Sequence, residues 1–165
     1  MNMNTRDMVI LSLITAQAVV LHYVEGFFPV IAPGAKLGLA NIMTIVTLYV
    51  FSAKHAFVVL GIRVLLGSLL SGNPMGILFS MVGGILSWFI MSILKRHPKH
   101  FSLVGVSTAG AAFHNLGQLA TASIIYNTIG IFFTYLPILM LTSVITGFFI
   151  GVASHYMIDY LEKHV

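Results

Sequence analysis

Residues Pro74 to Leu94 read PMGILFSMVGGILSWFIMSIL, a run of 21 residues without a charged side chain. An α-helix needs about 20 apolar residues to cross the hydrocarbon core of a bilayer, so this stretch predicts a transmembrane helix. The whole chain has the same character, because 58% of its 165 residues are hydrophobic and only 7% are charged. A soluble domain carries roughly a quarter of its residues as charged side chains. The composition therefore predicts an all-α integral membrane protein, in contact with the lipid bilayer and located in the cell membrane.

Five further segments have the length and composition of membrane helices. Turn signals separate them, namely PVIAPGAKLG, SAKH, SGNP, KRHPKHF and YNTIG. The six expected helices span residues 8–24, 39–53, 55–71, 74–94, 102–126 and 131–160. No second domain and no repeat is visible, so residues 1–165 are predicted to form a single six-helix transmembrane domain.

The Lys and Arg residues predict the orientation of this domain. With the N-terminus inside, the cytoplasmic pieces hold Arg6, Lys54, Lys95, Arg96, Lys99 and Lys163. The outer connections hold only Lys36, and Arg63 lies within a helix. Positive charge collects on the cytoplasmic side of membrane proteins, so both termini are expected in the cytoplasm. The net charge of +4 is thereby explained without a nucleic-acid partner.

Several classes of chemistry are absent from the sequence. There is no cysteine, and no G-x-x-x-x-G-K-[ST] loop that would bind ATP phosphates. The only acidic residues are Asp7, Glu25, Asp159 and Glu162, all at segment ends. Chemistry that requires Mg²⁺ needs clustered carboxylates, and none are clustered here. We therefore expect no catalytic residues, no metal site, no cofactor and no enzymatic activity of the chain alone.

The stretch GAAFHNLGQLATA, residues 110–122, places hydrogen-bonding side chains inside an apolar helix. His114 and Gln118 are one turn apart, and Thr121 follows on nearly the same face. Leu116 and Leu119 occupy the opposite side. This pattern is typical of a helix whose polar face meets protein or a cavity.

Arg63 lies near the middle of its predicted helix, and Asn41 lies in the first turn of another, shortly after Lys36. A lone Arg at the centre of a bilayer costs at least about 2.5–3.5 kcal/mol, so such a residue is a functional candidate. We expect Lys36, Asn41, Arg63, His114 and Gln118 to converge in the outer half of the bundle. There they would bind a solute with an anionic or carbonyl-rich end. The structural alternative is that Arg63 pairs with helix-end carbonyls and His114 with Asn115, as hydrogen bonds between helices.

Three segments carry a resemblance to a known family. GAKLGLANIMT (34–44), IRVLLGSLLSG (62–72) and GAAFHNLGQL (110–119) resemble the signatures of the Gx transporter family, often labelled heptaprenyl diphosphate synthase component I. That family is similar to the S components of energy-coupling factor transporters. The resemblance implies an S-component-like bundle of six helices that binds a vitamin- or cofactor-like solute at the outer face. A membrane coupling subunit and cytoplasmic ATPase subunits would be its partners.

Carried over to this chain, the resemblance implies substrate binding by six residues: Lys36, Asn41, Arg63, His114, Asn115 and Gln118. It also implies a docking stripe of small residues on the first helix, where Ser12 and Ala16 stand at the spacing of an Ala-x-x-x-Ala motif. The outer connection EGFFPVIAPGAKLG, residues 25–38, is equally consistent with a gate and with an interfacial segment.

Three other functions remain open at this point. One is a membrane accessory subunit of polyprenyl (heptaprenyl) diphosphate synthesis. Another is a stand-alone carrier, and the third is a structural role in an assembly. Flavin-like compounds and quinone or isoprenoid precursors are the candidate solutes for a transport subunit.

Overall fold

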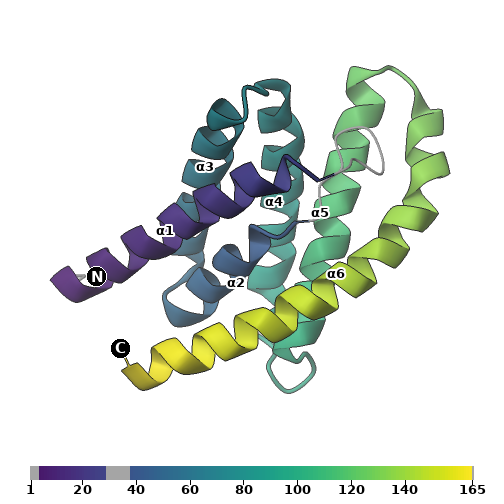
Figure 1. The fold of residues 1–165 in the computed structure, drawn as a ribbon. Coiled ribbons are helices and arrows are strands. Elements are labelled where there is room, and N and C mark those ends of the chain that lie inside the picture. The colour runs from purple at the N-terminus through teal and green to yellow at the C-terminus, as the bar shows by residue number, and fades with distance from the viewer. Residues whose placement is uncertain (1–3, 29–37, 165) are drawn as a thin grey trace.

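The computed structural model describes residues 4–28 and 38–164, which contain helices and connections but no strand (Figure 1). The six helices are α1 (Thr5–Glu25), α2 (Asn41–Val50), α3 (Ala53–Leu70), α4 (Met75–Leu94), α5 (Leu103–Ile125) and α6 (Ile129–His164). Their order and number confirm the predicted succession of helices, and most ends lie within a few residues of the predicted ones.

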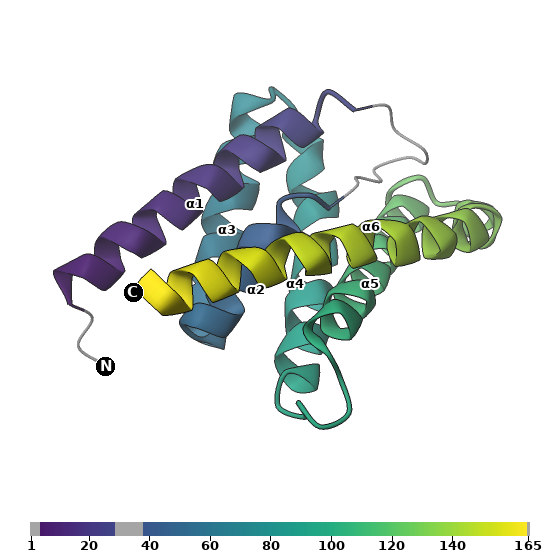
Figure 2. The ribbon, with the colours of Figure 1, turned by 60° about the horizontal axis from the view of Figure 1, so that its bottom comes forward.

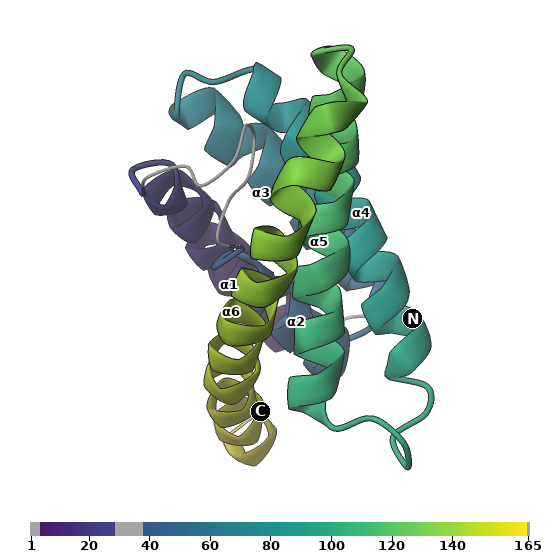
Figure 3. The ribbon, with the colours of Figure 1, turned by 90° about the vertical axis from the view of Figure 1, so that its right-hand side faces the viewer.

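The helices pack in two layers with α2 between them. Helices α3, α4 and α5 stand side by side, and α1 and α6 cross in front of them at an angle (Figures 1 and 3). Short α2 packs against α1, α3, α4 and α6, and 7 of its 10 residues are buried. The apolar core therefore surrounds α2, where Ile45, Val46 and Leu48 have almost no exposed surface.

Four of the helices, α1, α3, α4 and α6, are long and apolar enough to cross a membrane. Helix α5 is long enough but is not among them, because polar residues interrupt its apolar sequence. At its 10 residues, α2 is only about 15 Å long and cannot cross a hydrocarbon core of about 30 Å by itself. The second predicted helix, 39–53, is too long at both ends, because the observed helix begins at Asn41 and ends at Val50.

Helix α6 is the longest element, with 36 residues and Pro137 in its interior. A helix of this length measures about 54 Å, more than a bilayer core. Pro137 has no N–H to donate and weakens the helix locally. Figures 1 and 2 show α6 curving across the bundle from its start beside α5.

Four connections lie at two opposite ends of the bundle. The α2–α3 and α4–α5 connections lie at one end with the start of α1 and the end of α6, and the α3–α4 and α5–α6 connections lie at the other (Figure 1). The first end therefore carries the basic residues of segment 95–99 and of the start of α3. This grouping agrees with the predicted charge asymmetry; the assignment of that end to the cytoplasm stays a prediction.

Candidate functional site

Helix α5 combines several polar side chains with extensive burial. Of its 23 residues, 12 are buried, including His114, Asn115 and Gln118. Its neighbours α4 and α6 cover most of its surface. Polar side chains inside a membrane protein face the bundle, because exposure to lipid would leave their hydrogen bonds unmade.

Glycines bring α4 and α5 into backbone contact at the level of these side chains. A Cβ added to Gly117 would lie 2.7 Å from Cα of Gly83, closer than atoms can approach. A Cβ on Gly83 would lie 2.6 Å from the carbonyl oxygen of His114 and 3.0 Å from Cγ of Gln118. Small residues allow helices to approach this closely. The crossing therefore fixes the position of His114 and Gln118.

Arg63 is paired with the first residue of α2. Its Nη2 donates a hydrogen bond to Oδ1 of Asn41 at 2.7 Å, and the two residues are 2% and 3% exposed. Arg63 is the largest fully buried side chain among the described residues. A buried guanidinium needs several acceptors and a counter-charge to offset the loss of its hydration.

Glu25, at the end of α1, is a second buried charged residue of this region. Its carboxylate interacts electrostatically with Arg63, and the residue is only 4% exposed. Oε1 of Glu25 also accepts hydrogen bonds from the backbone N–H groups of Gly38 and Leu39, the latter at 3.0 Å. The chain that leads into α2 is thereby held against α1, inside the bundle.

Gly38 links this connection to α5. A Cβ added to it would lie 3.3 Å from Nδ2 of Asn41 and 3.9 Å from Cδ2 of His114. Its φ of 81° is in the left-handed region that favours glycine. The backbone at Gly38 thus lies between α2 and α5, and side chains from α1, α2 and α5 meet around it. We call Glu25, Asn41, Arg63, His114 and Gln118 the polar cluster.

Four of the six predicted site residues belong to this cluster: Asn41, Arg63, His114 and Gln118. Asn115 lies elsewhere, because its Nδ2 donates to the carbonyl oxygen of Leu139 at 3.0 Å and so connects α5 to α6. The Asn115 amide group thus bonds to α6, whereas the structural alternative pairs it with His114. Lys36, and most of the connection 25–38, lie outside the described residues.

The sequence did not single out two residues of the neighbourhood. The sequence shows Glu25 only as one of four acidic residues at segment ends, although a carboxylate in a chain with a buried Arg is a recognisable signal. His22, one turn earlier on α1, is 1% exposed, and its Nε2 lies 3.2 Å from Oγ of Ser68. A Cβ on Gly67 would lie 2.5 Å from the His22 ring, so Gly67 makes the room for this histidine.

Some hydrogen-bonding atoms of this region have no protein partner within the described ranges. They are Nδ2 of Asn41, Nε of Arg63 and, one helical turn after Asn41, Oγ1 of Thr44. A buried donor without an acceptor costs about 1–3 kcal/mol. A bound molecule that accepts these hydrogen bonds would recover that energy.

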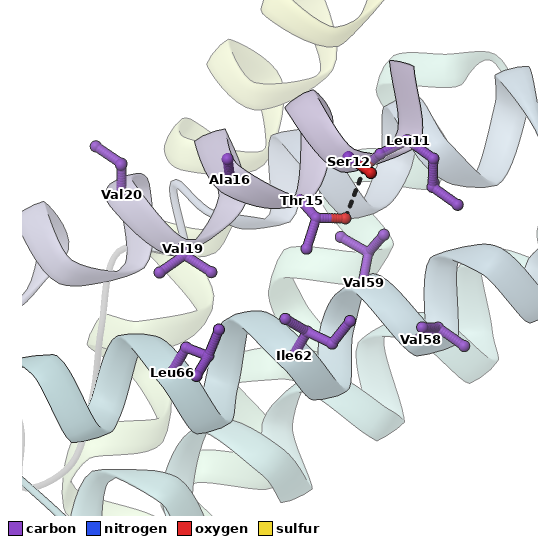
Figure 4. A pocket seen from close by; sticks show the side chains of 10 residues that line it. All are labelled: Leu11, Ser12, Thr15, Ala16, Val19, Val20, Val58, Val59, Ile62 and Leu66. Carbon is purple, nitrogen blue, oxygen red and sulfur yellow. Dashed lines mark hydrogen bonds between the residues drawn. The ribbon is translucent and has the colours of Figure 1, made fainter. Parts of the chain in front are cut away.

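A groove of about 590 Å³ lies apart from the polar cluster, between α1 and α3 (Figure 4). It is lined by Leu11, Ser12, Thr15, Ala16, Val19, Val20, Val58, Val59, Ile62 and Leu66. The hydroxyls of Ser12 and Thr15 donate to carbonyls of their own helix, at 2.8 and 2.7 Å. The groove therefore offers shape and apolar surface, whereas the polar cluster offers directional recognition.

Comparison with known proteins identifies a family. A family model described as heptaprenyl diphosphate synthase component I matches residues 14–157, from α1 to α6, and so includes every member of the polar cluster. No curated protein and no solved structure matches the chain. The extent of the family match shows that this chain belongs to the heptaprenyl diphosphate synthase component I family.

Proposed function

We propose that this protein is the substrate-binding membrane subunit, or S component, of an energy-coupling-factor-type ABC transporter. It would span the cell membrane six times and capture a small vitamin- or cofactor-like solute at the outer face. The observation that supports this most is the polar cluster, which includes buried Arg, Asn, His and Gln side chains from α2, α3 and α5. Donor atoms there still lack acceptors among the described residues.

The proposal assigns binding to this chain and energy to its partners. The sequence contains no phosphate-binding loop, so ATP hydrolysis would belong to cytoplasmic ATPase subunits. A membrane coupling subunit would connect them to this chain. The stripe of Ser12 and Ala16 supports α1 as its docking face, because both residues line the groove between α1 and α3 (Figure 4). Small residues at such a surface allow another helix to approach.

The polar cluster can be tested with a matched set of variants. The purified protein should retain a small molecule, identified by mass spectrometry, and Arg63→Ala and His114→Ala should each weaken its binding at least tenfold, about 1.4 kcal/mol. Asn115→Ala is the control, because Asn115 is a buried neighbour of His114 that bonds to α6. It should lower thermal stability but not affinity. Unchanged affinity in both test variants would refute the assignment of the site.

Transport is tested separately from binding. Vesicles that contain this chain, the coupling subunit and the ATPases should accumulate the solute only when ATP is supplied inside. Uptake by vesicles with this chain alone, driven by an ion gradient, would instead support the stand-alone carrier.

The description of the family favours a second candidate, a membrane accessory subunit of polyprenyl diphosphate synthesis. This function predicts that the chain co-purifies with a soluble, Asp-rich synthase and raises its activity. If the synthase keeps the same rate and product length with and without this chain, the second candidate is contradicted.

A further inference from the structure

Three threonines are buried among the described residues, and their hydroxyls differ in what they bond to. The hydroxyl of Thr47 donates to the carbonyl oxygen of Met43 at 2.7 Å, and that of Thr121 donates to the carbonyl oxygen of Gly117 at 2.8 Å. A threonine in a helix has such an acceptor one turn before it and needs no other partner. Thr44 is 1% exposed, and its Oγ1 has no protein partner among the described residues. Its hydroxyl is thus buried without the local bond that satisfies the other two.

Thr44 lies close to Asn41, because side chains three residues apart share one side of a helix. The Asn41 side chain is only half satisfied. Its Oδ1 accepts the hydrogen bond from Arg63 at 2.7 Å, whereas its Nδ2 has no partner within the described ranges. Nε of Arg63 also lacks one there. The three residues are at most 3% exposed. Three polar atoms without protein partners therefore occur together at the buried start of α2.

The start of α2 provides no side-chain cap that would explain these atoms. The N-cap residue, Ala40, is fully buried and has no polar side chain. The backbone N–H groups of Asn41 and Ile42 donate instead to the carbonyl oxygens of Gly38 and Leu39, at 2.9 and 3.1 Å. These backbone groups are thus satisfied, whereas the side chains are not. A buried polar atom without a partner is costly and rare in native proteins, which indicates a partner that is not part of the chain.

We propose that Thr44 is a recognition residue of the solute site, and that its hydroxyl and Nδ2 of Asn41 bind the same polar edge of the solute. This inference rests on the proposed solute-binding function and deepens it. The Cβ atoms of residues three apart in a helix are about 5–6 Å from one another. A ring system with two acceptor atoms on one edge can therefore bind both side chains. Carbonyl oxygens and ring nitrogens of a flavin-like compound or a quinone are such acceptors, whereas an isoprenoid chain has none.

The first measurement is the unfolding temperature of the ligand-free protein in detergent. Thr44→Val replaces the hydroxyl by a methyl group and removes an unpaired polar atom, so it should raise the unfolding temperature. Thr47→Val is the matched control, because Thr47 is fully buried one turn later on α2 and its hydroxyl is bonded to Met43. Its unfolding temperature should rise less or fall, since the substitution removes a hydrogen bond. The hydroxyl of Thr44 would thus be unfavourable in the empty protein.

The second measurement is affinity, determined by equilibrium dialysis with two probes, riboflavin and 1,4-naphthoquinone. Thr44→Val should bind the probe that the wild-type protein binds about tenfold more weakly, because an acceptor of the probe then meets a methyl group. Thr44→Ser keeps the hydroxyl and should stay within about threefold of the wild-type affinity. Thr47→Val should bind like the wild-type protein. A gain in stability together with a loss of affinity in Thr44→Val is a result that a purely structural threonine would not give.

Three results would overturn the role of Thr44 and leave solute binding intact. In the first, Thr44→Val does not fold or is less stable than Thr47→Val, so its hydroxyl has a structural partner. In the second, Thr44→Val binds the probe as the wild-type protein does, so the hydroxyl does not meet the solute. In the third, Thr44→Ser loses as much affinity as Thr44→Val, so the methyl group matters and not the hydroxyl. If the wild-type protein binds neither probe, the proposed binding of flavin-like or quinone solutes is itself contradicted, and the role of Thr44 falls with it.

Discussion

Gly38 combines an unusual backbone conformation with a position in contact with the polar cluster. Its φ of 81° is costly for any other residue, and an added Cβ would lie 3.3 Å from Nδ2 of Asn41 and 3.9 Å from Cδ2 of His114. Glu25 holds the same residue through its N–H group. A side chain at this position would therefore disturb the approach of α2 to α5 as well as the local backbone.

We predict that Gly38→Ala lowers both stability and solute affinity. The left-handed backbone alone costs about 1–2 kcal/mol for a residue with a Cβ, and the contact with Asn41 adds to it. Gly72→Ala is the matched control, since Gly72 also has a positive φ, 63°, but open space around it. It should show the conformational cost without the loss of affinity. Equal affinity for the two variants, measured by dialysis alongside thermal unfolding, would contradict the position of Gly38 in the site.

Individual residues also show which contacts of the polar cluster can be predicted from the sequence and which cannot. Arg63 and Asn41 could be predicted to meet because a buried charge and a buried amide require partners. The sequence does not identify Glu25 as a site residue, since a carboxylate at the end of a predicted helix is usually exposed to water. It is buried here, where the N–H groups of Gly38 and Leu39 donate hydrogen bonds to it.

At the scale of elements, the contact between α4 and α5 determines the geometry of the site. Gly83 and Gly117 face one another, and their backbones approach too closely for any side chain between them. The sequence shows both glycines but not that they face each other, because that depends on the rotation of two helices. Predicted helix boundaries were accurate for α3, α4 and α5, whose turn signals are clear.

We predict that Gly83→Ala or Gly117→Ala forces α4 and α5 apart and lowers the free energy of unfolding by about 1–3 kcal/mol. His114 and Gln118 would move with α5, so solute affinity should fall as well. Gly61→Ala is the control within a helix, because a Cβ there meets nothing within 4 Å. It should leave stability unchanged or raise it by about 0.5–1 kcal/mol through better helix propensity. A smaller loss for Gly83→Ala than for Gly61→Ala in thermal unfolding would refute the close crossing.

Helix α2 shows that hydropathy alone does not predict the length of a helix. The apolar run from Leu39 to Ala53 predicts a helix that spans most of a membrane. In the structure the helix begins at Asn41 beside Arg63 and ends at Val50. A buried segment is apolar whether or not it crosses the bilayer, so hydropathy cannot separate the two cases.

At the scale of the whole molecule, the α2–α3 and α4–α5 connections form one set and the α3–α4 and α5–α6 connections another, at opposite ends of the bundle (Figure 1). One set, together with the start of α1 and the end of α6, carries most of the basic residues. This arrangement is what the positive-inside rule requires of a protein with both termini in the cytoplasm.

We predict that the α5–α6 connection is outside the cell and the α4–α5 connection inside. The natural chain has no cysteine, so single cysteines can be introduced without a background. Thr128→Cys should react with a membrane-impermeant thiol reagent in intact cells, and Lys99→Cys only after the cells are opened. Labelling of Lys99→Cys in intact cells would invert the orientation and place the polar cluster nearer the cytoplasm.

The sequence by itself determined the class of this protein, because its lack of charge leaves lipid as the only suitable solvent for most of its surface. It also determined the succession of helices and the presence of buried polar residues that need partners. Only the tertiary structure decided which partners those are. Asn115 donates a hydrogen bond to α6, Glu25 accepts one from the backbone of Gly38, and α2 begins at a buried residue, Asn41. The reason is physical: the requirement that a buried polar group be satisfied can be read from one residue, but the atom that satisfies it comes from a distant segment, placed there by helix packing.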